Sequence, residues 1–306
     1  MKTKLRFIAA LAGGVTTITG IHSVAAQDWP QWRGPNRDDK VSGFTAPAKW
    51  PEVLTQKWRT TVGLGDATPA LVGDKLYVFS RQESDEVTLC LNAADGKELW
   101  RDHYGAQAVS GPASPHPGPR SSPTVADGKV ITLGVGGVLS CLDAATGKVQ
   151  WRKDEFPRMV PNFYTAMSPI VVDGLCIAHL GGRDNAAVIA FDLASGQVKW
   201  KWTGDGPAYA SPVTMTVAGV SQVVVQTQKN LVGLGVADGK LLWQVATPAQ
   251  RMAQNAATPI VDGQTVFYTG QGSGTKAVSI EKSGDNFAAK ELWTNDKLGT
   301  TFNTPV

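Results

Sequence analysis

The chain has 306 residues, of which 18% are charged, and it contains 33 Gly and 18 Pro. This composition argues against long solvent-facing helices and favours short strands joined by tight turns. The formal charge of +3 comes entirely from Lys2, Lys4 and Arg6, because the first 26 residues contain no acidic residue. The rest of the chain is electrically balanced, which excludes a charge-based reason to expect nucleic acid or an anionic membrane as a partner.

Residues 1–26 have the organisation of a secretory signal peptide. A basic start is followed by a mostly apolar stretch at 7–21 and by small residues at 24–26, where cleavage is expected. A membrane anchor is the alternative, but the stretch contains several Thr and Gly and is short for a membrane span. We therefore expect a periplasmic or secreted protein with no stable membrane span after cleavage. No Cys lies near the cleavage point, so lipid attachment there is not expected.

Residues 27–54 form a Trp- and Pro-rich segment before the first repeat. Trp29 and Trp32 are flanked by Pro30 and Pro35. The two rings are candidates for a recognition pair, but we favour a plug packed against the rest of the fold, since large rings gain most from burial.

One unit recurs about every 47 residues between residues 55 and 306. Each unit opens with Ser/Thr-Pro and closes with a Trp, and the closing residues are Trp58, Trp100, Trp151, Trp200, Trp243 and Trp293. Four strand signals lie inside a unit, as at 69–72, 75–79, 87–91 and 97–101. Pairs of Asp and Gly turn the chain between the first two strands, which is typical of tight hairpins.

A nearly repeated phrase joins the last two strands of four units, as in CLDAATGKVQW at 141–151. It begins with a small residue, turns at a Gly that we expect in the left-handed conformation, and ends at the Trp. The turn residues are Gly96, Gly147, Gly196 and Gly239. A large ring needs a flat slot and a partner for its indole N–H. We expect each Trp to lie over its own hairpin and against the next sheet, as a docking device between sheets.

Four short antiparallel strands in each unit predict an all-β fold, a β-propeller of four-stranded antiparallel blades with tryptophan-docking motifs. One such sheet buries too little apolar surface to be stable alone, so the sheets must stack on their neighbours. Cys90 and Cys141 occupy the first position of the phrase, which is always a small residue. Together with Cys176 they make three widely spaced Cys, an odd number. We interpret them as packing residues rather than redox groups.

The phrase resembles the tryptophan-docking motif of quinoprotein, or pyrroloquinoline-quinone-like, β-propeller repeats over residues 55–306. The segment DWPQWRGPNRD at 28–38 also resembles the start of exported bacterial proteins with such repeats. At fold level the chain is similar to the propeller subunit of the outer-membrane β-barrel assembly machinery. The resemblance implies an eight-bladed ring. The sequence supplies the last strand of one blade, five whole blades and the opening of another, so we expect a truncated part of that ring; a six-bladed ring is the alternative.

The resemblance places binding sites on the face where inter-blade loops and the loops between second and third strands meet the central channel. The candidates on this face are Asp66, Arg81, Arg120, Tyr164, Arg183, Asp184, Tyr209, Arg251 and Asn255. The connection at 102–120 is rich in Gly and Pro, and long loops of this kind are often functional. A single loop residue is more often an ordinary solvated or turn residue, so the hypothesis concerns the group as a whole.

Quinoproteins that oxidise alcohols or sugars use pyrroloquinoline quinone, a calcium ion and a catalytic carboxylate, and some have an adjacent Cys pair or a C-x-x-C-H haem site. The chain contains neither Cys signature. Spacing singles out none of Asp66, Asp184 and Asp205 as catalytic, and the His residues show no metal-ligand pattern. We therefore assign no catalytic residue and predict no cofactor and no metal.

The sequence predicts an exported, monomeric propeller that acts as a binding scaffold for a protein or polymer partner in the cell envelope. One alternative is a periplasmic alcohol or sugar dehydrogenase dependent on pyrroloquinoline quinone and calcium. Another is binding of an envelope polysaccharide through aromatic residues such as Tyr164 and Tyr209. The fold does not decide between them.

Overall fold

The computed structural model of the chain describes residues 27–247, 254–270 and 272–306. The expected signal peptide lies outside these residues. Within them, the regular structure consists of five four-stranded antiparallel sheets, each with its strands in chain order, and one short 3-10 turn, η1 (Gly111–Ala113). This arrangement confirms the predicted all-β fold of four-stranded blades.

The first sheet contains β1 (Ala70–Val72), β2 (Lys75–Gln82), β3 (Asp85–Asn92) and β4 (Glu98–Gly105). The second sheet contains β5 (Thr124–Ala126), β6 (Lys129–Leu133), β7 (Leu139–Asp143) and β8 (Val149–Lys153), and the third contains β9 (Ile170–Val172), β10 (Leu175–Gly181), β11 (Ala186–Asp192) and β12 (Val198–Trp202). The fourth sheet contains β13 (Val213–Val217), β14 (Val220–Gln226), β15 (Asn230–Gly235) and β16 (Leu241–Ala246), and the fifth contains β17 (Ile260–Asp262), β18 (Thr265–Gly270), β19 (Gly274–Ser283) and β20 (Asn286–Asn295).

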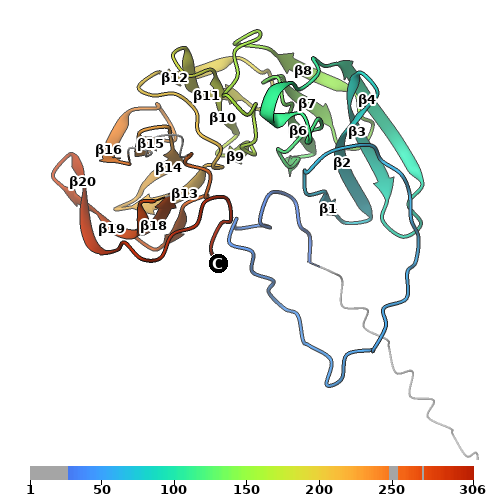
Figure 1. Cartoon of the computed structure of the whole chain (residues 1–306), viewed down its shortest axis with the longest axis horizontal. Helices are drawn as coiled ribbons and strands as arrows, with labels where there is room; N and C mark the ends of the chain where they lie inside the picture. The colour runs from blue at the N-terminus through green and yellow to red at the C-terminus, as the bar shows by residue number, and fades with distance from the viewer. Residues whose placement is uncertain (1–26, 248–253, 271) are drawn as a thin grey trace, which may run out of the picture.

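Figure 1 shows the five sheets side by side along an arc, with the labelled first strands β1, β9 and β13 toward the inside. The N-terminal segment, drawn in blue, crosses the open side of the arc. The described part of the chain contains five blades, and an eight-membered ring stays a prediction.

The fourth strand of every sheet carries the same irregularity. In the first sheet Cys90 pairs with Trp100 and Leu91 pairs with Glu98, so Leu99 is an extra residue. The other four sheets shift register at the corresponding place. A bulge of this kind increases the local twist of a strand. Here it also sets the small residue of the phrase directly opposite its Trp.

The Trp side chains join one sheet to the next. The indole N–H of Trp100 donates to the carbonyl of Ala144 at 3.1 Å, and the ring lies on Gly147 in the turn of the following sheet. Gly147 has a φ of 73°, and a Cβ at this residue would come within 2.5 Å of the ring. Three other Trp residues dock in the same way. The indole N–H donates from Trp58 to the carbonyl of Ala93 at 2.9 Å, from Trp151 to that of Leu193 at 3.0 Å, and from Trp200 to that of Val236 at 2.8 Å. The three rings lie on Gly96, Gly196 and Gly239, respectively.

Three positions depart from the expected docking pattern. Residues around Trp58 form no strand, although the ring docks, because no described strand lies beside them to complete a ladder. Trp243 is buried but donates to Gln222 Oε1 of its own sheet at 2.6 Å. The following hairpin has two ten-residue strands, β19 and β20, in place of the short Gly turn. Trp293 is 44% exposed because no described sheet follows it.

A second row of contacts joins the sheets at their inner ends. The backbone N–H of Ser122 donates to Ser168 Oγ, and that of Ser168 donates to Ser211 Oγ, both at 2.9 Å. The same donation runs from Thr68 to Ser122, from Ser211 to Thr258 and from Thr258 to Thr304, each at 3.1 Å. We call these residues the Ser/Thr row. Because the Pro after each one opens or precedes a first strand and has no N–H, it disturbs no ladder.

The N-terminal segment is hydrogen-bonded to the first strands of the arc and to the C-terminal residues. Trp29 exchanges backbone hydrogen bonds with Leu71 of β1 at 2.7 and 2.9 Å, and the carbonyl of Pro30 accepts the N–H of Val125 at 2.8 Å. Arg33 pairs with Asp39 at 2.5 Å and donates to the carbonyl of Pro305 at 2.8 Å. The segment therefore connects the first two sheets with the opposite end of the chain.

Arg37 also belongs to this segment and is buried. Its guanidinium donates to the carbonyls of Ser168 at 3.3 Å and Pro212 at 2.9 Å, and also to that of Pro169. Burial lowers its pKa to about 9, so the side chain stays charged near neutral pH. A planar fork of donors suits several carbonyls at once, which a Lys does not match.

We predict that Gly147→Ala lowers the free energy of unfolding by about 3 kcal/mol. The new Cβ would strain the left-handed backbone and also displace the Trp100 ring from its docking surface. Denaturant unfolding followed by tryptophan fluorescence measures the loss.

Gly128→Ala is the matched control, because Gly128 has a φ of 70° but no atom within 4 Å of the added Cβ. It should lose only the backbone contribution of about 1 kcal/mol. Equal losses in the two variants would contradict a docking role for Gly147.

Arg37→Met should destabilise the fold by about 3 kcal/mol, because buried carbonyls lose their charged donor. We also expect faster hydrogen exchange in residues 27–40, measured by mass spectrometry. Lys40→Met, at an exposed position of the same segment, should change neither quantity. Unchanged exchange in the Arg37 variant would show that Arg37 does not hold the segment.

Candidate functional site

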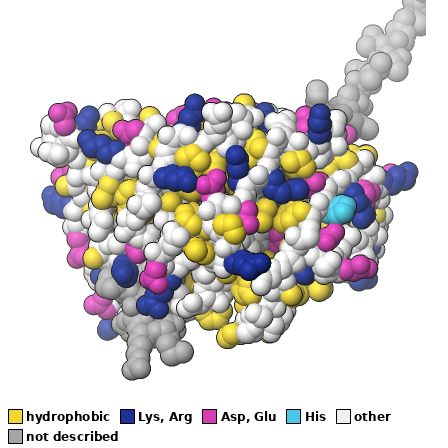
Figure 2. All heavy atoms as spheres, turned by 90° about the horizontal axis from the view of Figure 1, so that it is seen from above, with side chains coloured by type: hydrophobic (Ala, Val, Ile, Leu, Met, Phe, Trp, Pro, Cys, Tyr) yellow, Lys and Arg dark blue, Asp and Glu magenta, His cyan; other side chains and the backbone are white. Residues whose placement is uncertain are grey.

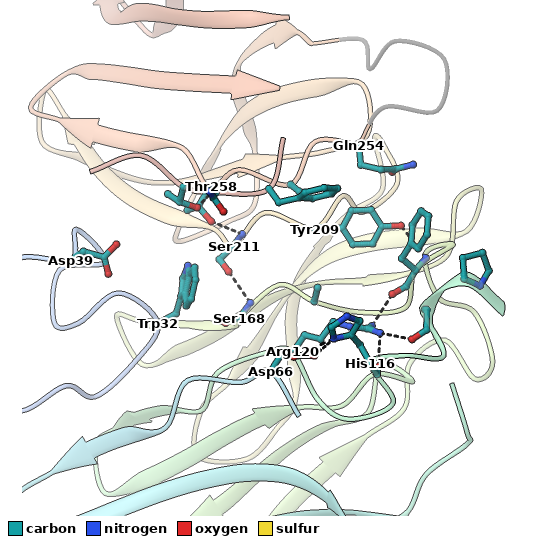
Figure 3. A pocket seen from close by; sticks show the side chains of 18 residues that line it. Trp32, Asp39, Asp66, His116, Arg120, Ser168, Tyr209, Ser211, Gln254 and Thr258 are labelled. Carbon is teal, nitrogen blue, oxygen red and sulfur yellow. Dashed lines mark hydrogen bonds and ion pairs between the residues drawn. The ribbon is translucent and has the colours of Figure 1, made fainter. Parts of the chain in front are cut away.

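Loops between the sheets converge on a cavity of about 890 Å³ at the inner side of the arc, which we call the hub cavity (Figure 3). Its walls come from the N-terminal segment, the inter-blade loops, the Ser/Thr row and the C-terminal residues. This volume lies in the range of small-molecule sites. The cavity is therefore the leading candidate for a binding site in the described structure.

One wall of the hub cavity is polar. His116 Nδ1 lies 3.0 and 3.2 Å from the two carboxylate oxygens of Asp66. The guanidinium of Arg120 donates to the carbonyls of Phe163 and His116 at 2.8 Å, and more weakly to that of Ala113 at 3.5 Å. Burial lowers the pKa of Arg120, while the nearby Asp66 carboxylate raises it. The charged groups of this wall therefore already have partners within the protein.

An aromatic part of the lining adjoins this polar wall, since Arg120 donates to the carbonyl of Phe163. The hydroxyl of Tyr209 accepts the backbone N–H of Phe163 at 3.1 Å, and the two rings meet edge to face with centroids 6.1 Å apart. Burial raises the pKa of Tyr209, so its hydroxyl stays protonated at neutral pH. Trp32 and Phe302, which lie far apart in the sequence, complete the aromatic lining.

Three of the predicted binding-face residues, Asp66, Arg120 and Tyr209, line the hub cavity. Tyr164 has its hydroxyl within 3.0 Å of the backbone N–H of Ser110. There it holds the connection between β4 and β5, which is shorter at its start than the predicted 102–120, because residues 102–105 belong to β4. Tyr164 has a φ of 66°, an unfavourable conformation for a non-Gly residue that the surrounding contacts must maintain.

The other predicted residues do not line the cavity. Arg81 donates to the carbonyls of three loop residues, at 3.1 to 3.3 Å, and Asn255 Nδ2 donates to three more, at 3.0 to 3.1 Å. Both side chains therefore hold loops in place. Arg183 and Asp184 are exposed in the turn between β10 and β11. Arg251 lies outside the described residues.

Several residues that shape the cavity are not among the predicted binding-face residues. Phe163 and Phe302 belong to no repeated position, and His116 shows no metal-ligand spacing in the sequence. The Ser/Thr-Pro pairs were recognised as the opening of each unit but not as part of a site, although four of these residues line the cavity. Their regular recurrence at the inner end of each sheet was the signal that could have revealed them.

Asp205, in the connection between β12 and β13, links the third and fourth sheets. Its carboxylate accepts the hydroxyl of Thr227 at 2.6 Å and the backbone N–H of Lys229 at 2.8 Å. His179 Nε2 donates to the carbonyl of Asp205 at 3.0 Å. Burial lowers the pKa of His179 to about 4. Asp205, considered earlier as a possible catalytic carboxylate, thus serves to fix a loop.

A buried carboxylate between the first two sheets is also structural. Glu86 Oε1 accepts the backbone N–H of Val135 at 2.9 Å, and its other oxygen accepts the hydroxyl of Tyr104. Burial raises the pKa of Glu86. The guanidinium of Arg152 lies 4.5 Å from the centroid of the Tyr104 ring and pairs with Asp102. These contacts connect the two sheets and leave Glu86 almost without exposed surface.

Four-stranded blades joined by docked Trp rings define a β-propeller with quinoprotein-like repeats. A family model described as outer membrane protein assembly factor BamB matches residues 52–201 and 168–306. The chain belongs to this family. Within the described residues, no helix is long and apolar enough to span a membrane.

Two curated relatives illustrate the range of similar proteins. The outer membrane protein assembly factor BamB of Xanthomonas campestris is 26% identical over 239 residues, which cover 60% of this chain and 56% of the relative. The quinohemoprotein alcohol dehydrogenase ADH IIB of Pseudomonas putida is 37% identical over 121 residues, which cover 37% of this chain and 16% of that enzyme. The chain therefore spans only part of the length of these relatives.

Solved structures show the same fold. BamB from Moraxella catarrhalis matches with a TM-score of 0.52 and 14% identity, covering 79% of this chain and 65% of that one. The quinohemoprotein alcohol dehydrogenase from Comamonas testosteroni matches with a TM-score of 0.62 and 18% identity, covering 92% and 52%. At these identities the likeness establishes the fold alone.

Within the described residues, no group of three or more His, Cys, Asp or Glu side chains is placed to hold a metal ion. The two carboxylates that line the hub cavity, Asp66 and Asp39, are paired with His116 and Arg33. The expected lack of a cofactor stays a prediction.

We predict that His179 makes the fold sensitive to acid. Its pKa is about 4 in the folded state and about 6.5 in an unfolded chain. Between these values the unfolded state binds a proton that the folded state does not, so stability falls by about 3 kcal/mol as the pH drops from 6.5 to 4.

Denaturant unfolding at a series of pH values should show that His179→Gln removes this loss. His103→Gln, at an exposed His, should retain it. A parallel decline of stability in the wild type and in the His179 variant would contradict the assignment.

Proposed function

We propose that the chain is a binding scaffold of the bacterial cell envelope that holds a protein partner against its loop face and catalyses no reaction. The loop face is the end of the sheets that carries the inter-blade loops and the turns between second and third strands. The proposal rests on family membership, since relatives in this family are described as outer membrane protein assembly factors. We infer that the partner belongs to the assembly of outer membrane proteins.

The structural observation behind the proposal is that polar side chains of the loop face hold loop backbones by hydrogen bonds. Arg81, Asn255 and Asp205 hold loop backbones by hydrogen bonds. A rigid set of loops on a fixed frame is suited to recognition, because little conformational entropy is lost on binding. Arg183 and Asp184 are exposed at the same end of the sheets and offer charged contacts to a partner.

The surface charge is consistent with a protein partner. In the view of Figure 2, Lys and Arg side chains alternate with Asp and Glu, and apolar side chains lie between them. On this face the basic side chains are interspersed with acidic ones and do not form the basic stripe that nucleic acid requires. The expected export of the chain would place this surface in the periplasm.

We predict that a photoreactive amino acid at position 183 or 184 forms crosslinks in intact cells to a protein of the outer-membrane assembly system. Mass spectrometry of the crosslinked species identifies the partner. The same amino acid at positions 238 and 240 serves as the control, because both lie exposed in the turn between β15 and β16, at the opposite end of the sheets. Identical crosslinks from both ends would overturn the proposal.

The dehydrogenase alternative is tested on the same purified chain. After incubation with pyrroloquinoline quinone and Ca²⁺ followed by gel filtration, a scaffold should retain no quinone absorption and should not reduce an artificial electron acceptor with alcohols or sugars. Retained quinone together with acceptor reduction would replace the scaffold by an enzyme.

A further inference from the structure

The hub cavity contains an arc of hydroxyl groups that retain their protons for a ligand. Ser168, Ser211, Thr258 and Thr304 all line the cavity, and Figure 3 shows the first three in a row. Each hydroxyl oxygen accepts the backbone N–H of the preceding blade. Among the described contacts, none of the four donates to a protein acceptor. Since a hydroxyl is both donor and acceptor, each retains one O–H for hydrogen bonding.

Hydrogen-bond acceptors complement these donors across the cavity. The carboxylate of Asp66 has further lone pairs beyond its contact with His116, and the side chain of Asn303 also lines the cavity. The Tyr209 hydroxyl accepts an N–H from Phe163 and thus keeps its own proton. A ligand that both accepts and donates hydrogen bonds around its edge would match this lining.

The cavity also offers flat apolar surfaces. Tyr209 and Phe163 form one edge-to-face pair, and Phe302 presents a ring that is 74% exposed. Concave sites with aromatic walls and a few fixed polar groups are typical of small-ligand recognition. Such walls suit a ligand that has apolar ring faces and a hydroxyl-bearing edge.

The pairing of charges in the cavity argues for an uncharged ligand. Arg120 is engaged with backbone carbonyls, Asp39 pairs with Arg33, and the Asp66 carboxylate lies within hydrogen-bond distance of His116 Nδ1. An anion would therefore find no free guanidinium fork, which is the usual means of carboxylate or phosphate recognition.

An extended peptide fits less well. Strand addition needs a row of free backbone N–H and C=O groups. At the inner edge, the N–H groups of Ser122, Ser168, Ser211 and Thr258 already donate along the Ser/Thr row. The residue that follows each of them is Pro, which has no N–H.

We propose that the hub cavity binds a short uncharged oligosaccharide, with sugar ring faces on Phe302, Phe163 and Tyr209 and sugar hydroxyls on the Ser/Thr row and Asp66. This inference goes beyond the scaffold function and does not depend on it.

Isothermal titration calorimetry with the purified chain tests the inference. The probes are the uncharged trisaccharides chitotriose, cellotriose and maltotriose, with trigalacturonic acid as an anionic comparison and a capped Phe-Thr-Phe peptide as a peptide comparison. We expect at least one uncharged trisaccharide to bind, and to bind more tightly than either comparison.

Phe302→Ala should weaken this binding about tenfold through the loss of ring stacking. Phe302 is largely exposed, so the variant should fold normally. The matched control is Phe44→Ala, since Phe44 is 60% exposed and lies outside the cavity lining. It should bind like the wild type. Tyr209→Phe, which keeps the ring and removes the hydroxyl, should weaken binding by a smaller factor and provides a second test.

Several outcomes would overturn the inference. They are no binding of any uncharged trisaccharide at millimolar concentration, tighter binding of the anion or of the peptide, and binding that neither Phe302→Ala nor Tyr209→Phe reduces. Failure of these titrations would leave the crosslinking test of the scaffold function unaffected, so the two proposals can fail separately.

Discussion

The structure depends on one repeated contact, in which the indole of one blade donates to a backbone carbonyl in the next blade and rests on a left-handed Gly. Trp100 on Ala144 and Gly147 is the model case. A four-stranded sheet buries too little surface to be stable alone, and this contact supplies both apolar area and a satisfied indole N–H. The Trp of the preceding blade rests on the Gly turn of each hairpin, and the Trp of that hairpin rests on the following blade. Each blade is therefore stabilised by both of its neighbours along the arc.

Such coupling explains how the chain can present loops from a fixed frame. The Ser/Thr row joins the inner ends of the blades by hydrogen bonds. Arg37 binds the N-terminal segment to the third and fourth sheets, and Asp205 and Asn255 hold individual loops in place. The Arg81 side chain likewise satisfies backbone carbonyls of neighbouring loop residues. Membership in the family of outer membrane protein assembly factors is consistent with a protein whose function lies in the surfaces that it holds in position.

The sequence predicted the blades well because their determinants are local. The phrase from Cys141 to Trp151 contains a small residue, a turn Gly and a Trp within eleven positions. The repeating pattern of such phrases and turns is enough to predict four strands in each unit and a Trp that docks on the next sheet. It could not predict that Trp243 binds Gln222 of its own sheet, because that depends on the length of the next hairpin. Nor could it assemble the hub cavity, since Trp32, Phe163 and Phe302 meet only when loops far apart in sequence converge. Asp66, Arg120 and Tyr209 were found because they precede recurring Ser/Thr-Pro pairs.

The most direct test of the docking contact is hydrogen exchange of the indole N–H groups, followed by NMR on a sample labelled with ¹⁵N at tryptophan. The indoles of Trp58, Trp100, Trp151 and Trp200 donate to carbonyls of a neighbouring blade and should exchange slowly. Those of Trp50 and Trp293, which are 59% and 44% exposed, should exchange rapidly. Rapid exchange at all six positions would contradict the account, because it would mean that the rings do not join the blades.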